Sequence, residues 1–236
     1  MCKFFSCCVD KKGHVYWEPG VNNHEIVEIF KLKDDTDNQQ ELKFARVEIT
    51  PKDGDIFNKN IDNWGLRIDE DIIPEWFSPM HEKHCFNALE KCLDDCVFSD
   101  VTISKIKDKK GLYFKNVVVQ EMYGSSVVQE MYDSSVVQRM YDSSVVQEMY
   151  GSSVVQRMYD SSVVQEMYGS SVVQRMYGSS VVQEMYGSSV VQEMYGSSTC
   201  MVYSKNVNFS IKSEFSVVIC RINNNITIYK GENYVC

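Results

Sequence analysis

The most regular feature of the chain is a nine-residue pattern of apolar and polar positions that repeats nine times between residues 118 and 198. Each copy reads Val-Val-Gln-Glu/Arg-Met-Tyr-Gly/Asp-Ser-Ser. On an α-helix, which turns about 100° per residue, successive copies would fall on opposite sides, so no continuous apolar stripe could form. Val and Tyr favour pleated structure, whereas Gly, Asp and Ser favour turns. The pattern therefore predicts one short strand and one turn per copy.

Nine residues are too few to close around a packed interior, but two copies can form a flattened coil with two facing strands. We therefore predict a parallel β-solenoid with two nonapeptide repeats in each 18-residue coil. Alternation along the strand predicts that Ser126, Val128 and Met131 point inward. The residues of this copy that we expect to point outward are Val127, Gln129 and Tyr132.

Glu and Arg alternate at the fourth position of successive copies. With 18 residues per coil, Glu residues stack on one flat face and Arg residues on the other. If one copy formed a full coil, Glu and Arg would instead alternate along a single column. Exposed like charges in water cost only tenths of a kcal/mol, so the sterics of closure favour the two-copy coil. The residues expected to form an interaction surface are Tyr132, Tyr141, Tyr150, Tyr159, Tyr168, Tyr177, Tyr186, Arg139, Arg157, Arg175, Glu130, Glu148, Glu166 and Glu184.

The alternative for this segment is a low-complexity, disordered region produced by recent duplication. Disordered segments are usually poor in Val, Met and Tyr, which make up more than a third of each copy, so the ordered solenoid is favoured.

Before residue 100 the pattern is mixed and predicts an α+β module. The turn sequence at 10–13 separates two short apolar runs, as in a β-hairpin. The expected elements are strands over 4–9, 15–17, 44–49 and 64–68 and a helix over 80–96. Asn23 is expected to cap a further helix. The apolar face of that helix carries Ile26, Val27, Ile29, Phe30 and Leu32.

The composition divides the chain into three expected parts. They are an α+β module at 1–100, a β-solenoid repeat domain at 101–203 and a C-terminal β cap at 204–236. Residues 101–117 are expected to form an irregular first coil, and 197–203 a decayed repeat. Apolar runs at 215–220 and 225–229 predict strands that close the stack.

Several segments of the first 76 residues together resemble a family of uncharacterised phage and prophage proteins. The segments that carry this resemblance are Met1-Cys2-Lys3-Phe4, Val15-Tyr16-Trp17, His24-Glu25, Phe44-Ala45-Arg46-Val47-Glu48-Ile49-Thr50-Pro51, Trp64-Gly65-Leu66-Arg67-Ile68-Asp69 and Ile73-Pro74-Glu75-Trp76. The resemblance implies an N-terminal module joined to short solenoid repeats, and an origin in a mobile element. It implies no catalytic assignment. The chain departs from the family pattern at Cys7 and Cys8, where small residues are common, and in the uniformity of its repeats.

The net charge of −9 lies wholly in the N-terminal module. The first 100 residues contain 21 acidic and 12 basic residues, and the remainder contains 12 of each. Such a surface disfavours binding to nucleic acid and permits a basic protein partner or mimicry of a polyanion. An ordinary solubilising charge is the simpler interpretation.

Neither a secretory signal nor a segment long enough to cross a membrane is evident in the sequence, so we expect a cytoplasmic protein. Nine scattered cysteines, with none inside the repeat, fit reduced thiols better than a disulfide framework.

Cys2 is the sharpest candidate for catalysis. Removal of Met1 would place a thiol and an α-amino group on one residue, and an N-terminal nucleophile can use its own amine as the base. The residues that would then orient or stabilise an acyl or amide substrate are His24, Arg46, Glu48, Arg67 and Asp69. The alternative is that Cys2 is a small buried residue at the start of a strand.

The Arg and Glu/Asp residues of this set have a second interpretation. Alternate residues of a strand share a face, so Arg46 with Glu48, and Arg67 with Asp69, form either a functional cleft or an ordinary cross-strand salt-bridge ladder.

A cluster of His and Cys residues between 81 and 96 has spacings that can present ligands to zinc. Its pairs are His81 with His84 and Cys92 with Cys96. The two pairs lie two to three helical turns apart, however, so Cys residues as small apolar fillers of an amphipathic helix are favoured. We expect neither a metal nor a cofactor.

The leading functional hypothesis is a non-enzymatic interaction protein. Its α+β module binds a protein partner, such as a host factor, and its solenoid supplies a rigid surface that also permits self-association. The rival hypothesis is a small Cys2-dependent hydrolase or amidotransferase in which the repeats are a spacer.

Overall fold

The computed structural model describes residues 4–33, 42–71, 73–223, 225–231 and 234–235. The chain forms two compact units, residues 1–97 and residues 98–236. The first is a small sheet with helices, and the second is a parallel β-solenoid of about seven turns with about 18 residues per turn.

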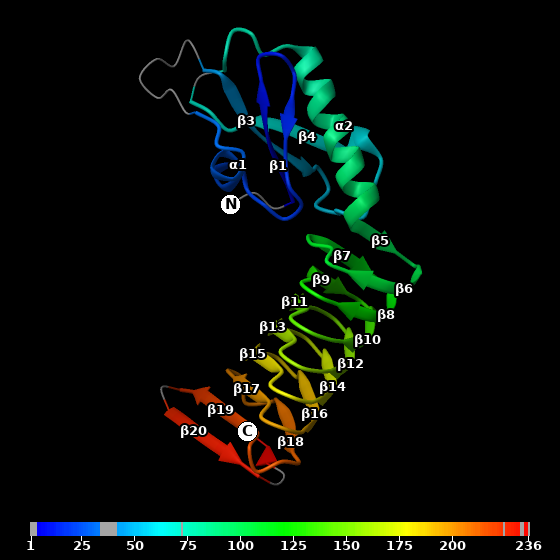
Figure 1. The fold of residues 1–236 in the computed structure, drawn as a ribbon, viewed down its shortest axis with the longest axis vertical. Helices are drawn as coiled ribbons and strands as arrows, with labels where there is room; N and C mark the ends of the chain where they lie inside the picture. Colours follow the sequence, from blue (N-terminus) through cyan, green and yellow to red (C-terminus); the bar gives the residue numbers. More distant parts are fainter. Residues whose placement is uncertain (1–3, 34–41, 72, 224, 232–233, 236) are drawn as a thin grey trace. The chain divides into compact units, whose positions relative to one another are not determined.

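The first unit contains a four-stranded antiparallel sheet in the order β2-β1-β3-β4 (Figure 1). Its strands are β1 (Phe5–Asp10), β2 (Val15–Tyr16), β3 (Phe44–Pro51) and β4 (Trp64–Ile68). Its helices are α1 (Asn23–Ile29), the 3₁₀ helix η2 (Ile61–Asn63) and α2 (Pro79–Cys96).

Strand β1 is the most deeply buried strand of this sheet. Residues Phe5 to Val9 are all buried, so both faces of the strand are covered. Ile26 of α1 packs with Cys8 and Phe44 in one cluster, and α2 also packs against β1. The two helices therefore bury a sheet that would otherwise expose an apolar face.

The structure corrects the predicted cap of the first helix. Asn22 is the N-cap: its side chain accepts a hydrogen bond from Glu25 N, and the Glu25 carboxylate accepts from Asn22 N. The predicted apolar face is also narrower than expected, because only Ile26 is fully buried, while Ile29 and Phe30 are exposed. Asn23 is instead a buried side chain within the helix.

The solenoid has two sheets, and its coils contribute strands to each in turn (Figure 1). We call them the Glu sheet and the Arg sheet after the residues that their middle strands carry. In the Glu sheet the strands are β5 (Val97–Ser99), β7 (Leu112–Lys115), β9 (Val127–Tyr132), β11 (Val145–Met149), β13 (Val163–Met167), β15 (Val181–Met185), β17 (Thr199–Val202), β19 (Val217–Ile222) and β20 (Asn225–Lys230).

The Arg sheet contains the even-numbered strands from β6 to β18, together with β21. They are β6 (Thr102–Lys107), β8 (Val118–Tyr123), β10 (Val136–Met140), β12 (Val154–Met158), β14 (Val172–Met176), β16 (Val190–Met194), β18 (Asn208–Ile211) and β21 (Tyr234–Val235). Pairing within both sheets joins residues 18 apart, as in Val136 with Val154 and Val145 with Val163. The predicted parallel solenoid with 18 residues per coil is thus confirmed.

The interior of the solenoid consists of stacked Val, Met and Ser columns. In the copy that begins at Val127, the side chains of Ser126, Val128 and Met131 are completely buried, as predicted. The equivalent Val and Met residues of every other copy are also completely buried and form one continuous core. Burying one such Val or Met side chain stabilises the fold by about 1.5–3 kcal/mol.

Each turn between copies passes through the left-handed region at its Gly or Asp. Gly169 has φ +64°, and a Cβ built on it would lie 3.1 Å from the carbonyl oxygen of Gly151 in the preceding coil. Asp142 adopts φ 59°, and its carboxylate accepts a hydrogen bond from Gly124 N at 2.9 Å. Asp tolerates this conformation better than most residues because its side chain can hydrogen-bond the backbone.

Parallel pairing continues at both ends of the stack, with register shifts such as that between Leu112 and Tyr113. Residues 101–117, expected to form an irregular coil, contribute β6 and β7, which pair in parallel with β8 and β9. Parallel pairing also continues beyond residue 203, through β18 and β19. Antiparallel pairing begins with β20 on β19 and β21 on β18, and these strands cover the end of the stack.

Most cysteines that the structure describes are buried free thiols: Cys7, Cys8, Cys85, Cys92, Cys96 and Cys200. Cys220 is disulfide-bonded, so the expectation of reduced thiols is wrong at that position. Within the described residues, no helix is long and apolar enough to span a membrane.

Candidate interaction surface

The outer face of the Glu sheet carries a column of four stacked carboxylates. Glu130, Glu148, Glu166 and Glu184 occupy equivalent positions on successive strands, as the pairing register shows. All four side chains are half-buried. Among the described residues, no ion pair neutralises any of them. This face therefore presents an uncompensated row of negative charge.

A tyrosine two residues further along each strand hydrogen-bonds the carboxylate of the same strand. The hydroxyls of Tyr132, Tyr150, Tyr168 and Tyr186 donate to Glu130, Glu148, Glu166 and Glu184, in each case to Oε2. The pattern arises because residues two apart on a strand point to the same side. Each carboxylate thus receives a donor from its own strand, and its second oxygen, Oε1, is left for another partner.

These contacts shift the pKa values of both groups. Burial, followed by the charge of Glu148, raises the pKa of Glu130 above its ordinary value of 4.5. The hydrogen bond to Glu184, together with burial, raises the pKa of Tyr186 to about 12. Burial and the bond to Glu148 likewise raise the pKa of Tyr150. The hydrogen bonds to the carboxylates therefore favour neutral tyrosines, while burial and the charge of Glu148 disfavour the ionised form of Glu130.

The outer face of the Arg sheet carries a mixed column. Arg139, Arg157 and Arg175 stack in register, and Glu121 and Glu193 occupy the same position one coil before and one coil after them. Arg139 Nη2 lies 2.8 Å from Glu121 Oε1, and Arg175 Nε lies 2.7 Å from Glu193 Oε2. The two end arginines are therefore paired between coils.

Arg157 differs from its two neighbours. It is exposed, and it forms no ion pair with any residue that the structure describes. It lies one coil from Arg139 and one coil from Arg175. The centre of this face consequently has one guanidinium group that no described residue of the chain pairs with.

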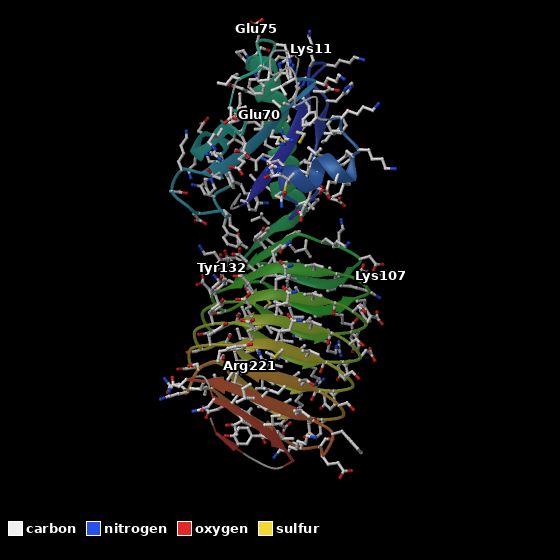
Figure 2. All side chains as sticks on the ribbon, turned by 90° about the vertical axis from the view of Figure 1, so that its left-hand side faces the viewer. Lys11, Glu70, Glu75, Lys107, Tyr132 and Arg221 are labelled. Atoms are coloured by element: carbon white, nitrogen blue, oxygen red, sulfur yellow. The ribbon has the colours of Figure 1, made fainter. Side chains whose placement is uncertain are left out.

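Tyrosine rings form a stacked column beside each charged column. In the Glu sheet, successive rings from Tyr132 to Tyr186 have centroids 5.1–5.2 Å apart and are nearly parallel. In the Arg sheet, Tyr123, Tyr141, Tyr159, Tyr177 and Tyr195 stack in the same way. These rings are half-buried, not fully outward as expected, because each covers the next. Figure 2 shows Tyr132 at the edge of the solenoid.

The two glutamates that border the Arg column were missed in the sequence analysis. The signal was visible: strict alternation of Glu and Arg fails at both ends, because the first two copies both carry Glu and so do the last two. With an 18-residue coil, these exceptions place Glu121 and Glu193 next to arginines. The column is therefore not purely basic.

The polar residues proposed for catalysis gather at one hollow of the first unit. His24, Arg46, Arg67 and Asp69 line an open hollow of about 420 Å³, together with Ile68, Glu70 and Asp71. Glu70 is labelled in Figure 2. The structure thus brings four of the six candidates together, and Glu48 adjoins them through Arg67.

Both arginines of this hollow form ion pairs with neighbouring carboxylates. Arg67 Nη2 lies 2.9 Å from Glu48 and 3.1 Å from Asp69, and Arg46 Nη1 lies 3.0 Å from Glu70. Glu70 was not foreseen as the partner of Arg46. The Asn23 amide donates to Asp69 at 2.9 Å. The arrangement is that of a salt-bridge network on adjacent strands. Cys2 lies outside the described residues, so its proposed catalytic role stays a prediction.

His81 and His84, whose spacing suggests metal ligands, instead contact backbone carbonyl groups. His84 Nδ1 lies 2.8 Å from the Gly13 carbonyl oxygen, and buried His81 lies within 3.3 Å of the Lys11 carbonyl oxygen and 2.9 Å of Ser78 Oγ. They attach α2 to the turn between β1 and β2. Within the described part of the chain, no group of three or more His, Cys, Asp or Glu side chains is arranged to hold a metal ion.

The thiols of Cys92 and Cys96 interact with each other. Their hydrogen bond, together with burial, raises the pKa of Cys92. A buried thiol with a raised pKa is a poor metal ligand, since the thiolate is the ligating form. These two residues therefore serve as apolar packing on α2.

Comparison of the chain with protein-family models, with curated proteins and with solved structures finds no match.

Proposed function

We propose that the chain is a non-enzymatic interaction protein whose solenoid is a two-faced binding surface. The observation that carries this proposal is the pair of charged columns, one acidic and one largely basic, held at fixed spacing on a single buried core. The nonapeptide is the building unit: two copies make one coil, and the fourth residue of each copy sets the charge of its face. Addition or loss of copies changes the length of the surface without changing its chemistry.

The side chains on both faces are of the kinds that concentrate binding energy. Tyr and Arg are enriched at the centres of protein interfaces, and here the tyrosines are pre-ordered by stacking. A rigid row of groups also loses little conformational entropy when a partner binds. A protein partner with its own extended, regular surface fits this array best.

The acidic first unit is the second part of the proposal. Its charge suits a basic protein partner, and its ion-paired hollow offers recognition groups. By the resemblance of its opening segments, the setting we propose is an accessory role of a phage or prophage protein, acting on a host factor in the cytoplasm.

The experiment is affinity capture from cells that naturally contain the chain, with deletions that respect the coil. Removing residues 127–198 deletes four 18-residue coils and joins Ser126 to Thr199, which follows in the same sheet. Removing residues 145–162 deletes one coil and is the matched control. We expect partners of the solenoid to be retained by the one-coil deletion and lost from the four-coil deletion. Partners that survive both deletions would reduce the solenoid to a spacer.

Charge variants of single faces sharpen this test. The Glu-sheet variant replaces Glu130, Glu148, Glu166 and Glu184 with Gln, and the Arg-sheet variant replaces Arg139, Arg157 and Arg175 with Gln. Gln matches Glu in size and, although shorter than Arg, keeps a polar hydrogen-bonding side chain on the outer face, so the buried core of the coil is maintained. The proposal predicts that a solenoid partner is lost from one variant and retained by the other. Equal capture by both variants and the original chain would contradict it.

A further inference from the structure

The two faces of the solenoid are complementary in charge and have the same spacing. The Glu sheet presents four carboxylates with no ion-pair partner among the described residues, and the Arg sheet presents three arginines at equivalent positions. Both columns advance by one strand spacing, about 4.8 Å, per coil. When one Glu of the first copy faces one Arg of a second copy, the neighbouring Glu and Arg residues of the two columns therefore face each other as well.

We propose that the Glu face of one copy of this chain binds the Arg face of a second copy, with Glu and Arg paired coil by coil. This rests on the proposed function, because it takes the solenoid to be a binding surface, and it names a second copy as the partner.

The unused groups on both faces fit this contact. On the Glu face, each tyrosine hydroxyl occupies Oε2 of its carboxylate, which leaves Oε1 to accept from a guanidinium. On the Arg face, Arg157 is exposed and has no ion pair, while Arg139 and Arg175 each retain further N–H donors. Arg157 is thus the natural centre of the contact.

The raised pKa of Glu130 agrees with this view. Burial and the neighbouring carboxylate of Glu148 disfavour its charge, and the hydrogen bond from Tyr132 offsets them only in part. A row of guanidinium groups from a second copy would supply the missing opposite charge. Half-buried valines at the first strand position of each copy, such as Val145 and Val154, add an apolar strip to both faces.

The contact does not close on itself. The acidic face of one copy meets the basic face of the next, so the outer copies of any assembly keep one unused face each. Such a heterologous contact produces an open series of assemblies, unlike a symmetric dimer. Oppositely charged faces also make its strength fall with added salt.

The test measures the molar mass of the full-length chain by sedimentation velocity from about 5 to 200 µM, in about 0.05 M and about 0.5 M NaCl. We expect dimers and higher species that increase with concentration and are weakened at high salt. Arg157→Glu should weaken association at least about tenfold, because it removes the central pair and places a carboxylate opposite the Glu column. Since Arg157 has no ion-pair partner among the described residues, this change should leave the fold intact, which circular dichroism would verify.

Two further variants complete the design. Lys205→Glu is the matched control, because it changes the net charge equally but lies exposed in a turn outside both faces. Glu148→Arg should also abolish self-association, and mixing it with Arg157→Glu should restore a complex between the two variants. That rescue depends on complementary charge across the contact, which a general loss of stability cannot imitate.

Two results would overturn the inference. One is a monomer at all concentrations in low salt, and the other is association that Arg157→Glu and Lys205→Glu affect equally. If the chain is monomeric but the face variants still lose a captured protein, the inference fails and the proposed function stands. If neither self-association nor solenoid-dependent capture is found, both fail.

Discussion

The Glu and Arg sheets share one core and one coil length, and each carries a tyrosine stack, yet the contacts of their charged columns differ. In the Glu sheet, every carboxylate receives a hydrogen bond from a tyrosine of its own strand, and like charges remain stacked. In the Arg sheet, Glu121 and Glu193 pair with arginines of neighbouring coils. The Glu face is thus held by bonds within strands, whereas the Arg face combines the Tyr123–Glu121 bond within β8 with ion pairs between coils.

The difference shows which interactions determine the fold. A buried Val, Met and Ser column is common to both sheets, whereas the sign of the surface charge is not. A column of like charges is tolerated because the electrostatic cost of exposed groups is small beside the burial of the core. The surface chemistry is therefore free to vary at one position per copy.

The largest expected effect should be equal in the two sheets. Met149→Ala in the Glu sheet and Met158→Ala in the Arg sheet each remove a completely buried side chain. We expect each to destabilise the solenoid by about 2–5 kcal/mol. The two values should be closely similar, because both residues occupy equivalent positions in the core. Urea unfolding followed by circular dichroism measures this.

Tryptophan fluorescence provides the internal control for that experiment. Trp17, Trp64 and Trp76 all belong to the first unit, so their signal should not shift in either variant. A markedly smaller effect in one sheet would show that the two sheets do not share an equivalent core.

The next largest effect, the loss of a tyrosine hydroxyl, should differ between the two sheets. Tyr150→Phe removes the donor to Glu148, whereas Tyr159 donates no side-chain hydrogen bond to a described residue. We expect Tyr150→Phe to cost about 0.5–1.5 kcal/mol and Tyr159→Phe close to nothing, since both keep the stacked ring. The same unfolding assay compares them. Equal losses would mean that ring stacking, and not the Tyr–Glu bond, holds the Glu face.

The stability contributions of Glu130 in the Glu sheet and Glu193 in the Arg sheet should depend on pH in opposite directions. Burial raises the pKa of Glu130, so its folded state holds a proton more tightly than the unfolded chain does. Its stabilising contribution is fully present below pH 4.5 and is lost as the pH rises through the raised pKa. Glu130→Gln should therefore stabilise the solenoid at neutral pH by up to about 1 kcal/mol and have little effect in acid.

The stability contribution of Glu193 should change with pH in the opposite direction to that of Glu130. The hydrogen bond and charge of Arg175 lower its pKa, so its contribution is present above pH 4.5 and is lost as the pH falls through the lowered pKa. Glu193→Gln should lower the melting temperature at neutral pH and leave it unchanged in acid. Melting curves across this pH range test both variants, and shifts of the same sign at neutral pH would refute the assignment.

The smallest effect belongs to Arg157. Because it has no ion pair within the described chain and lies between two arginines, Arg157→Gln should change the stability of the monomer by no more than about 0.5 kcal/mol. Thermal melting of a dilute sample at high salt measures this. A large loss of stability would show that Arg157 has a partner within the chain, which would contradict this prediction.

The sequence predicted the solenoid well because its information is periodic. Repetition of Ser126, Val128 and Met131 at a nine-residue spacing dictates which side chains enter the core, and closure of the coil dictates the 18-residue register. The roles of Asn22 and Asn23 could not be separated in the same way, because either can cap a helix and only tertiary packing buries one of them against Asp69.

The ion pairs around the hollow of the first unit could likewise be predicted only in part from the sequence. Strand alternation predicted that Arg67 and Asp69 share a face, and they form an ion pair. It did not identify Glu70 as the partner of Arg46, because Glu70 lies after the end of β4, where the path of the chain no longer follows strand geometry.

The central claim is that Glu and Arg copies lie on opposite faces of an 18-residue coil, and paired cysteines test it most directly. Positions 139 and 157 are register neighbours in the Arg sheet, at a separation that suits a disulfide, whereas 148 and 157 lie in different sheets. Under mild oxidation, the account predicts rapid cross-linking in Arg139→Cys/Arg157→Cys and none within a chain in Glu148→Cys/Arg157→Cys, as mapped by mass spectrometry. Preferential cross-linking of the second pair would indicate a nine-residue coil with Glu and Arg in one column, and would contradict the account.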